Sequence, residues 1–427
     1  MLIELAYGRD GLTVDLPDDV DILRPAFVPG VGNEAQALRD ALHHPINSPP
    51  LRELVTSDDR VVIVHTDITR PTPNDRIMPV LTAELEQAGV RPENITLLNG
   101  LGTHRFQTDA ELRQMLGNAI VDRYRCLQHD CTDDASLVSL GQTSKGHPVR
   151  INRHYMESSF KILTGFIEPH FFAGFSGGPK AVLPALAGTE SVYTNHGYGM
   201  ISHTHAAWGI TEGNPIWEEM CEMALRTEPH FLLNVTLNNK REITGIFAGD
   251  LLTAHKQGTA FVKEHAMVAV DAPYDVVVTT NSGYPLDQNL YQAVKGMSAA
   301  VQILRKGGAI LIAAACEDGL PHHGLYAELL QQAGSPQRAL EMIAEPGFEA
   351  QDQWQVQIQA QIQLKADVYV YADGLTDSQI EQALCTPSRN IESTLADLKE
   401  RYGSRIAVVP EGPQTIPYLA HQREHAS

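Results

Sequence analysis

The chain is poor in basic residues. Its 427 residues include 32 lysines and arginines against 52 aspartates and glutamates, a formal net charge of −20 at pH 7. Sequence-independent binding of DNA or RNA needs a basic face, and docking on an anionic lipid surface needs basic clusters. We therefore expect neither nucleic acid nor a membrane as a partner. An anionic small molecule remains compatible with this charge if a few cations are concentrated at its site.

Long apolar stretches and paired cysteines are also missing. The longest apolar runs, such as residues 309–315, are far shorter than the roughly 20 residues of a membrane helix. The N-terminal stretch MLIELAYGRDGLTVDLP has neither the basic start nor the apolar core of a secretory signal peptide. The five cysteines are scattered, which is typical of reduced thiols rather than of a disulfide framework. These features predict a cytoplasmic protein.

Two common nucleotide-binding motifs are absent. The stretch GFSGGPK (174–180) is only superficially similar to a phosphate-binding P-loop, because Pro179 precedes Lys180 and Ala181 stands where the magnesium-binding hydroxyl belongs. No GxGxxG follows any predicted strand. The sequence therefore disfavours an ATPase and a nicotinamide-dependent dehydrogenase.

What the sequence does show is an alternation of strand-like and helix-like segments. Residues 60–65 form a predicted buried strand, residues 75–88 an amphipathic helix, and residues 94–98 and 161–164 two further strands. Such alternation is typical of α/β proteins with largely parallel sheets, whose strand-end loops carry the chemistry. We therefore predict an α/β fold.

The alternating pattern restarts near residue 272, which predicts two α/β domains. We expect residues 1–271 to form an N-terminal domain that carries the loop around Lys180, and residues 272–403 to form a C-terminal domain. For residues 404–427 we expect a return to the N-terminal domain.

Residues 168–196, EPHFFAGFSGGPKAVLPALAGTESVYTNH, concentrate chemically active side chains. They include His170, the turn glycines Gly177 and Gly178, Lys180 and His196. Histidines bind metals or move protons near neutral pH, and glycines let the backbone approach a ligand closely. A lysine at the end of such a loop is a phosphate partner or a point of covalent attachment. The segment is typical of an active-site floor.

Two more strand-end loops and one helix carry candidate residues. In HTDITRPTP (65–73), Asp67 and Arg70 can hold an anion or form a salt bridge with each other. In LNGLGTHR (98–105), His104 is a candidate acid/base or a structural histidine. A predicted helix in GYPLDQNLYQAVKGM (283–297) carries Tyr291, Gln292 and Lys295. These three side chains either bind a small carboxylate or form a solvated helix face.

Taken together, these segments resemble the nickel-dependent lactate racemase family. The resemblance covers about residues 60–357 and is carried by DITRP (67–71), LGTHR (101–105), PHFFAGFSGGPK (169–180), TNH (194–196), EGNP (212–215), GYPLDQNLYQAVKGM (283–297) and DQWQVQ (352–357). It implies two α/β domains with the active site in the cleft between them. It also implies a racemase or epimerase of small 2-hydroxy acids, lactate or a related one.

The resemblance further implies a nickel pincer nucleotide, the nickel complex of pyridinium-3-thioamide-5-thiocarboxylic acid mononucleotide. By position, Lys180 is joined to it through a thioamide, and His196 is the protein's ligand to nickel. A square-planar nickel with soft sulfur donors and one imidazole is chemically sensible. The remaining residues implied to bind the cofactor are Asp67, Arg70, Gly177, Gly178 and Trp354, the last of which can equally be a core tryptophan.

By the same resemblance, His104 and His170 are paired acid/bases. One histidine takes the hydroxyl proton while the hydride at C2 moves to the cofactor, and the resulting 2-keto acid rotates, recovers the hydride on its other face and is reprotonated by the second histidine. Two are needed because a racemase treats mirror-image substrates. Lys295, with Gln292 and Tyr291, is implied to hold the substrate carboxylate.

The sequence departs from the family pattern at Phe106, where a proline is expected beside His104. This departure leaves the choice of 2-hydroxy acid open, and the sequence also leaves the oligomeric state open. Three alternatives remain. One is a zinc-dependent hydrolase with His104, His170 and His196 as ligands. The others are a non-catalytic carrier of the cofactor and a sensor of 2-keto or 2-hydroxy acids.

Overall fold

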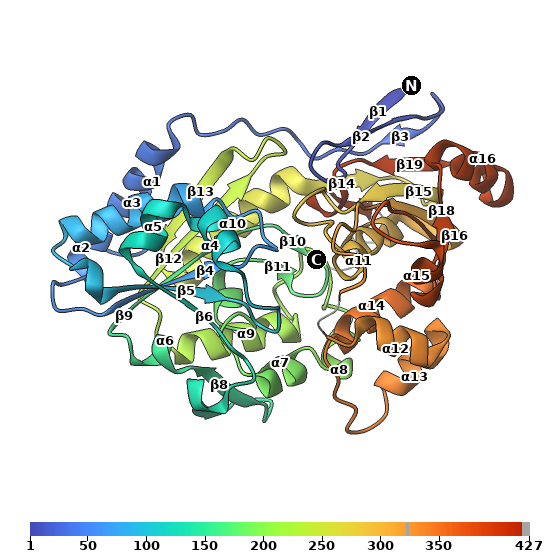
Figure 1. Cartoon of the computed structure of the whole chain (residues 1–427). Helices are drawn as coiled ribbons and strands as arrows, with labels where there is room; N and C mark the ends of the chain where they lie inside the picture. Colours follow the sequence, from blue (N-terminus) through green and yellow to red (C-terminus); the bar gives the residue numbers. More distant parts are fainter. Residues whose placement is uncertain (322–323, 421–427) are drawn as a thin grey trace. The chain divides into compact units, whose positions relative to one another are not determined.

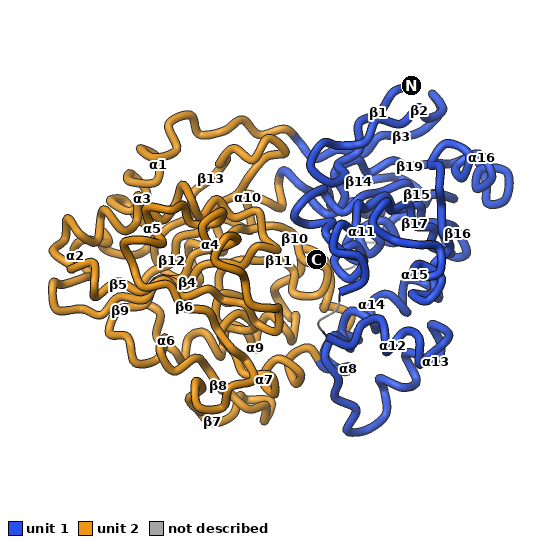
Figure 2. The backbone as a smooth tube through the Cα atoms, in the orientation of Figure 1, with its two compact units in different colours: residues 1–26, 197–202, 265–427 blue, residues 27–196, 203–264 orange. Residues whose placement is uncertain are grey.

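The computed structural model describes residues 1–321 and 324–420, which divide into two compact units (Figure 2). Unit 1 comprises Met1–Ala26, Gly197–Ser202 and the chain from His265 onward, and unit 2 comprises Phe27–His196 and His203–Glu264. Both units are of the α/β class, as predicted.

Unit 2 is built on a six-stranded sheet in the order β13-β12-β9-β4-β5-β6 (Figure 1). All neighbours pair in parallel except β13, which is antiparallel to β12. The strands are β4 (Val61–Thr66), β5 (Ile95–Gly100), β6 (Arg125–Gln128), β9 (Phe160–Phe166), β12 (Phe231–Leu237) and β13 (Ile243–Gly249).

Helices cover this sheet because its strands are apolar on both faces, as is usual for parallel sheets. Ile63 of β4 and Leu97 of β5 belong to one buried cluster with Leu81 of α3 (Asn74–Gln87) and residues of the other helices around it. These helices are α1 (Glu34–His43), α2 (Leu51–Leu54), α4 (Asp109–Leu116) and α5 (Asn118–Arg123). Each fully buried aliphatic side chain contributes about 1.5–3 kcal/mol, so this cluster fixes the sheet that carries the site loops.

The remaining elements of unit 2 form the surroundings of the site. They are the antiparallel pair β7 (Leu137–Gln142) and β8 (Pro148–Asn152), the short pair β10 (Pro169–His170) and β11 (Gly174–Phe175), and the helices α6 (Arg153–Glu157), α7 (Thr189–Asn195), α9 (Pro215–Arg226) and α10 (Leu251–Ala266). A short 3-10 helix, η3 (Gly178–Ala181), carries Lys180.

Unit 1 is built on a second six-stranded sheet in the order β18-β17-β16-β15-β19-β3, parallel throughout. Its strands are β3 (Asp21–Ile22), β15 (Tyr274–Thr280), β16 (Leu304–Ala313), β17 (Ala366–Tyr371), β18 (Thr386–Ser388) and β19 (Ile406–Val409). A separate parallel pair is formed by β14 (Met267–Val270) and β20 (Ile416–Leu419).

Helices also cover the sheet of unit 1. One buried cluster contains residues of β15, β16 and β19 together with α16 (Ile391–Tyr402) and the hairpin of β1 (Leu2–Leu5) and β2 (Leu12–Asp15). Against β15, Gly296 of α11 (Leu290–Ala300) packs so closely that an added Cβ would lie 2.1 Å from the carbonyl oxygen of Thr280. The other helices are α8 (Tyr198–Ile201), α12 (Tyr326–Ala333), α13 (Pro336–Ile343), α14 (Gln353–Gln363) and α15 (Asp377–Gln382).

The units differ from the domain boundaries expected from the sequence. The first 26 residues belong to unit 1, where β3 pairs with β19, and not to unit 2. The strand β19 pairs with β15 in the same sheet, so residues 404–420 do not return to the N-terminal domain, while residues 421–427 lie outside the described residues. Sequence periodicity could not show this, because it identifies strands but not their neighbours.

Candidate active site

The predicted strand-end loops of unit 2 share one edge of its sheet. Strands β9, β4 and β5 are parallel neighbours, so their carboxyl ends lie side by side. Asp67 and Arg70 follow β4, His104 follows β5, and residues 168–180 follow β9. Ligands of open α/β sheets bind at this edge, so the fold places the candidates of unit 2 where chemistry is expected.

His104 and Asp67 form a hydrogen-bonded pair. The Nδ1 atom of His104 lies 2.6 Å from Oδ2 of Asp67, and the other carboxylate oxygen accepts the Thr69 hydroxyl at 2.8 Å. Burial alone would raise the pKa of Asp67, but the charge and hydrogen bond of His104, followed by the charge of Arg70, hold that pKa below its ordinary value. Asp67 is therefore a carboxylate that fixes the orientation of the His104 ring.

Arg70 is turned toward other partners. Its Nη1 donates to the Thr69 hydroxyl at 3.1 Å, and its Nε lies 3.9 Å from Oε1 of Glu168. The ion pair of Asp67 is with His104 and that of Arg70 is with Glu168, so the alternative of an Asp67–Arg70 salt bridge is not what the loop forms.

Unsatisfied polar atoms gather at the start of α3 and the ends of β4 and β5. Among the described residues, five side-chain atoms there are buried without a hydrogen-bond partner: Nε2 of His65, Oγ1 of Thr66, Oγ1 of Thr72, Oδ1 of Asn74 and Oδ1 of Asn99. The N-cap residue of α3 is Pro73, which makes no side-chain cap hydrogen bond. Buried polar groups are normally hydrogen-bonded, and an uncapped helix start attracts anions. This place therefore suits a polar ligand with a negative charge.

His170, Lys180 and His196 surround one aromatic ring, that of Phe172. The ring centroids of His170 and His196 lie 4.5 Å and 5.0 Å from that of Phe172, and the Lys180 amine lies 5.7 Å from it. Nδ1 of His170 accepts the backbone N–H of Ala173 at 3.3 Å. The structure thus brings together three residues that the sequence spreads over 27 positions.

His196 is held as a neutral imidazole. It follows the last residue of α7, and its ring is buried. Burial, followed by the nearby Lys180 charge, lowers the pKa of His196 well below its ordinary value. A metal ligand must be a neutral imidazole, so this environment suits the role that the sequence assigned to His196.

The loop before Lys180 needs its glycines. Gly177 and Gly178 have φ of 75° and 53°, and a Cβ on Gly178 would lie 2.6 Å from the His255 ring. The Gly178 N–H donates to Oδ1 of Asn234 at 2.8 Å, and Nε2 of His255 donates to the Ser176 carbonyl at 2.8 Å. Burial lowers the pKa of His255 to about 4, so its ring is neutral.

Sequence reasoning missed the supports of this loop. Besides Asn234 and His255, Asn214 donates to the carbonyl of Phe172 at 2.8 Å while its side-chain oxygen caps α9. A glycine-rich turn signals that something approaches closely, and EGNP signals a helix start. Neither pattern tells which distant side chains meet there.

In unit 1, the three residues predicted to hold a carboxylate lie on α11. Nζ of Lys295 donates to Oε1 of Gln292 at 2.7 Å, and the Tyr291 hydroxyl accepts Nε1–H of Trp354, on α14, at 2.8 Å. Lys295, Gln292 and Trp354 are buried, so the alternative of a solvated helix face is wrong. Phe106 of unit 2, by contrast, is 54% exposed.

The described residues offer no protein-only metal centre. Residues 1–321 and 324–420 contain no group of three or more His, Cys, Asp or Glu side chains placed to hold an ion. The zinc hydrolase built on His104, His170 and His196 is therefore without its ligand set. Nor do any helices in that part of the chain combine the length and apolar character needed to cross a membrane.

Two family models and two curated relatives match this chain over most of its length. The family model described as the lactate racemase N-terminal domain matches residues 7–209, and that of the lactate racemase C-terminal domain matches residues 269–416. A lactate racemase from Thermoanaerobacterium thermosaccharolyticum is 34% identical over 97% of this chain and 98% of its own length. One from Lactiplantibacillus plantarum is 34% identical over 96% and 98%.

Solved structures agree. The lactate racemase apoprotein from T. thermosaccharolyticum superposes with a TM-score of 0.90 at 32% identity, covering 98% of this chain and 100% of that one. A Thermotoga maritima protein has a TM-score of 0.72 at 19% identity over 92% and 100%, a likeness of fold alone. The fold and these matches define an isomerase, and specifically a racemase. The chain belongs to the lactate racemase family, as its motifs implied.

Proposed function

We propose that this chain racemises or epimerises a small 2-hydroxy acid, lactate or a close relative, with a nickel pincer nucleotide attached to Lys180. The observation that carries the proposal is the gathering of His170, Lys180 and His196 around the ring of Phe172. These are the side chains assigned to proton transfer, covalent attachment and nickel. The two relatives named lactate racemase support the substrate class.

The residues of unit 2 fit such a cofactor. Lys180 stands half-buried at the end of a loop in which Gly177 and Gly178 leave no room for side chains. His196 is neutral, as a nickel ligand must be. Arg70 and the unsatisfied atoms at the start of α3 suit the phosphate of a mononucleotide. We propose that Trp354 of unit 1 also contacts the cofactor.

The cofactor, when bound, supplies a reversible acceptor for the hydride at C2 of the substrate. The protein's own task is to move the hydroxyl proton. His104 donates its Nδ1–H to Asp67, so its Nε2 has a free lone pair and acts as a base. In His170 the backbone N–H of Ala173 occupies Nδ1, so Nε2 is the ring atom through which His170 exchanges a proton with the substrate.

Racemisation requires that, at the start of a turnover, one of the two histidines is a neutral imidazole, the base, and the other an imidazolium, the acid. One enantiomer loses its hydroxyl proton to the base, and the product of opposite hand receives a proton from the acid. After one turnover the protonation states of His104 and His170 are exchanged, which prepares the pair for the reverse reaction. Asp67, which the resemblance places at the nucleotide, is in our proposal the residue that orients His104.

In unit 1, Lys295 supplies the positive charge for the substrate carboxylate. Its amine is held by Gln292, and the neighbouring Tyr291 hydroxyl is held by Trp354. A charge-assisted hydrogen bond to a carboxylate contributes about 1.5–3 kcal/mol, which is sufficient to hold one end of the substrate while the other reacts.

The test is to produce the chain in a host that makes the cofactor, beside a Lys180→Ala variant. We expect the intact mass of the wild type to show a covalent adduct, with nickel present and D- and L-lactate interconverted on a chiral column. The variant should lack all three. If the wild type carries no adduct, the proposed cofactor is wrong, and the alternative of a sensor of 2-keto or 2-hydroxy acids remains. If the wild type carries the adduct but interconverts no 2-hydroxy acid, the result favours a non-catalytic carrier of the cofactor.

A further inference from the structure

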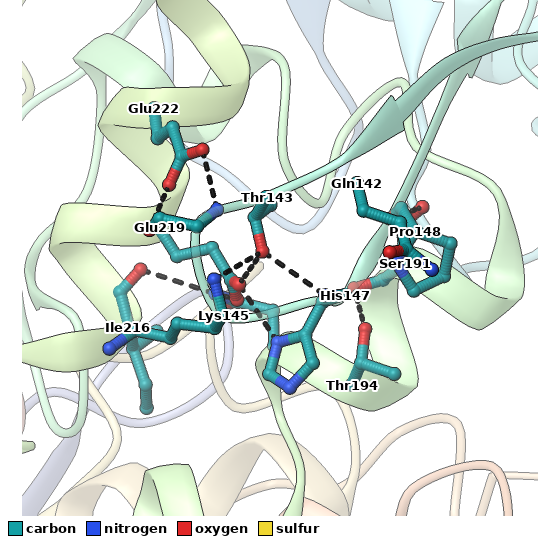
Figure 3. A network of polar contacts seen from close by, with 12 residues as sticks. Gln142, Thr143, Lys145, His147, Pro148, Ser191, Thr194, Ile216, Glu219 and Glu222 are labelled. Carbon is teal, nitrogen blue, oxygen red and sulfur yellow. Dashed lines mark hydrogen bonds and ion pairs between the residues drawn. The ribbon is translucent and has the colours of Figure 1, made fainter.

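A buried carboxylate outside the proposed site ties together three elements of unit 2 (Figure 3). Glu219 lies on α9, and its side chain is fully buried, with 0% exposure. Its Oε1 accepts the Thr143 hydroxyl at 2.7 Å and lies 2.8 Å from Nδ1 of His147. Its Oε2 accepts Nδ2–H of Asn195 at 2.9 Å. One oxygen therefore faces the turn between β7 and β8, and the other faces α7.

The second of these contacts leads to the proposed metal ligand. Asn195 is the last residue of α7, and its amide also donates to the carbonyl of Ile216 on α9 at 3.2 Å. The next residue is His196, whose backbone N–H closes the helix on the carbonyl of Val192 at 2.9 Å. Fixing the Asn195 side chain fixes the end of α7 and so the starting point of the His196 side chain.

A carboxylate is a costly way to join two helices. Removing its charge from water costs several kcal/mol, and apolar packing of similar volume holds helices together without that cost. What a carboxylate adds is direction, because each oxygen requires a donor at hydrogen-bond distance. The carboxylate of Glu219 therefore positions the end of α7 more specifically than apolar packing would.

We propose that Glu219 is a positioning residue for His196. It holds the end of α7 through Asn195 and is itself anchored by Thr143 and His147, so that the imidazole is kept in place for nickel. This inference rests on the proposed function, because it takes His196 to be the ligand. Partners beyond the first ligands commonly change metal affinity by about 10- to 100-fold when they are mutated.

Glu219→Gln is the informative substitution. The carboxylate accepts on both oxygens, whereas glutamine has one oxygen and one NH2 group, so one of the two sides must place a donor against a donor. Glu222 on the same helix provides the matched control. It accepts the Ser144 N–H at 2.8 Å and the Ser144 hydroxyl at 2.7 Å from the same turn, and its ion pair is with Arg226 on its own helix.

The measurement is nickel per covalent adduct, from metal analysis and intact mass of the protein loaded in a cofactor-making host. In the proposed function, Lys180 holds the organic part of the cofactor and His196 holds the nickel. The ratio of nickel to adduct therefore distinguishes loss of the metal from loss of the whole cofactor. We expect Glu219→Gln to keep the adduct and lower its affinity for nickel by about tenfold, seen as faster loss to a chelator. Glu222→Gln should match the wild type.

A second variant guards against a failure to fold. Asn195→Ala removes the donor to Oε2 and leaves Glu219 with Thr143 and His147, and we expect the same fall in nickel per adduct. If both variants keep the wild-type ratio, or lose adduct and nickel in equal proportion, Glu219 is a structural residue and the inference is wrong. A wild type without adduct would overturn the proposed function itself, and this inference with it.

Discussion

The imidazole of His104 and the carboxylate of Asp67 lie 2.6 Å apart, from Nδ1 to Oδ2, at the ends of two neighbouring parallel strands. A buried carboxylate bound to one ring nitrogen determines which tautomer the histidine adopts and leaves the other nitrogen to act as a base. The sequence showed both residues as candidates but assigned them separate tasks. Their hydrogen bond connects those tasks and leads to the first prediction.

Asp67→Asn keeps the shape of the side chain and removes its charge. We expect kcat to fall by about 100-fold or more, because the amide no longer stabilises the protonated ring or fixes its tautomer. Adduct and nickel should be retained. Thr69→Val, which removes the 2.8 Å hydrogen bond to Asp67 and the 3.1 Å hydrogen bond from Arg70, is the milder control. Loss of the adduct in Asp67→Asn would instead return Asp67 to the nucleotide-binding role that the sequence implied.

His104→Gln and His170→Gln test the two-histidine scheme. Each variant should lose racemisation in both directions, because every turnover takes one proton and returns another, while nickel and adduct stay at the wild-type level. Chiral chromatography started from each enantiomer measures this. His203→Gln, at an exposed histidine of the same unit, should behave as the wild type. Wild-type turnover in His104→Gln or His170→Gln would show that the two-histidine scheme is wrong.

Lys295→Met tests whether Lys295 of unit 1 binds the substrate carboxylate. We expect KM to rise by about 10- to 100-fold, the equivalent of one charge-assisted hydrogen bond, with nickel unchanged. Lys306→Met, at an exposed lysine of the same unit, should leave KM as it is. If Lys295→Met lost nickel at an unaltered KM, the lysine would belong to the cofactor and not to the substrate.

Local pattern predicted the elements beneath the site closely. The predicted strands at residues 60–65 and 94–98 are β4 (Val61–Thr66) and β5 (Ile95–Gly100), and the predicted helix at 75–88 is α3 (Asn74–Gln87). Apolar periodicity determines such elements because it depends on residues a few positions apart. The parallel order then placed the strand-end loops at one edge, so the candidate residues of unit 2 could also be found.

Contacts between distant residues were beyond the reach of the sequence. Glu219 meets Thr143 across 76 positions, and Asn234 meets Gly178 across 56. A lone glutamate on an amphipathic helix is usually a solvated residue, and nothing local distinguishes one that is buried. The placement of residues 1–26 in unit 1 is a failure of the same kind, because the pairing of β3 with β19 joins segments almost 400 positions apart.

Glu111→Gln tests the support of the loop that carries His104. Glu111 closes the capping box of α4 with Thr108 and accepts both arms of Arg105 at 2.7 and 2.9 Å. The Arg105 hydrogen bonds, partly opposed by burial, lower the pKa of Glu111 to about 2. A pKa lowered by folding stabilises the protein above the unfolded value and ceases to do so as the pH falls through the folded one.

The variant should therefore lose about 1 kcal/mol of stability at pH 7, after allowance for partial exposure. The difference from the wild type should shrink as the pH is lowered from about 4.5 toward 2. Urea midpoints across this range measure it. Asp109→Asn, which breaks an exposed pair with Arg113, should cost less at pH 7. A gap between wild type and Glu111→Gln that stays constant with pH would show that the ion pair contributes nothing.

Gly178→Ala tests the loop that carries Lys180. The residue has φ of 53°, and its Cβ would lie 2.6 Å from the His255 ring. That ring cannot yield easily, because it stacks on Trp217 at 4.9 Å and is hydrogen-bonded to the Ser176 carbonyl. We expect the loop to shift and the adduct to be lost, with about 1–3 kcal/mol of destabilisation.

Gly141→Ala separates the clash from backbone strain. Gly141 has φ of 84° but has open space where a Cβ would go, so alanine there should cost only the strain of about 1–2 kcal/mol. Its adduct should stay at the wild-type level. The melting temperatures of the two variants measure the destabilisation, and their intact masses measure how much adduct each carries. If Gly178→Ala loaded the adduct as fully as Gly141→Ala does, close packing of this loop on His255 would not be what places Lys180.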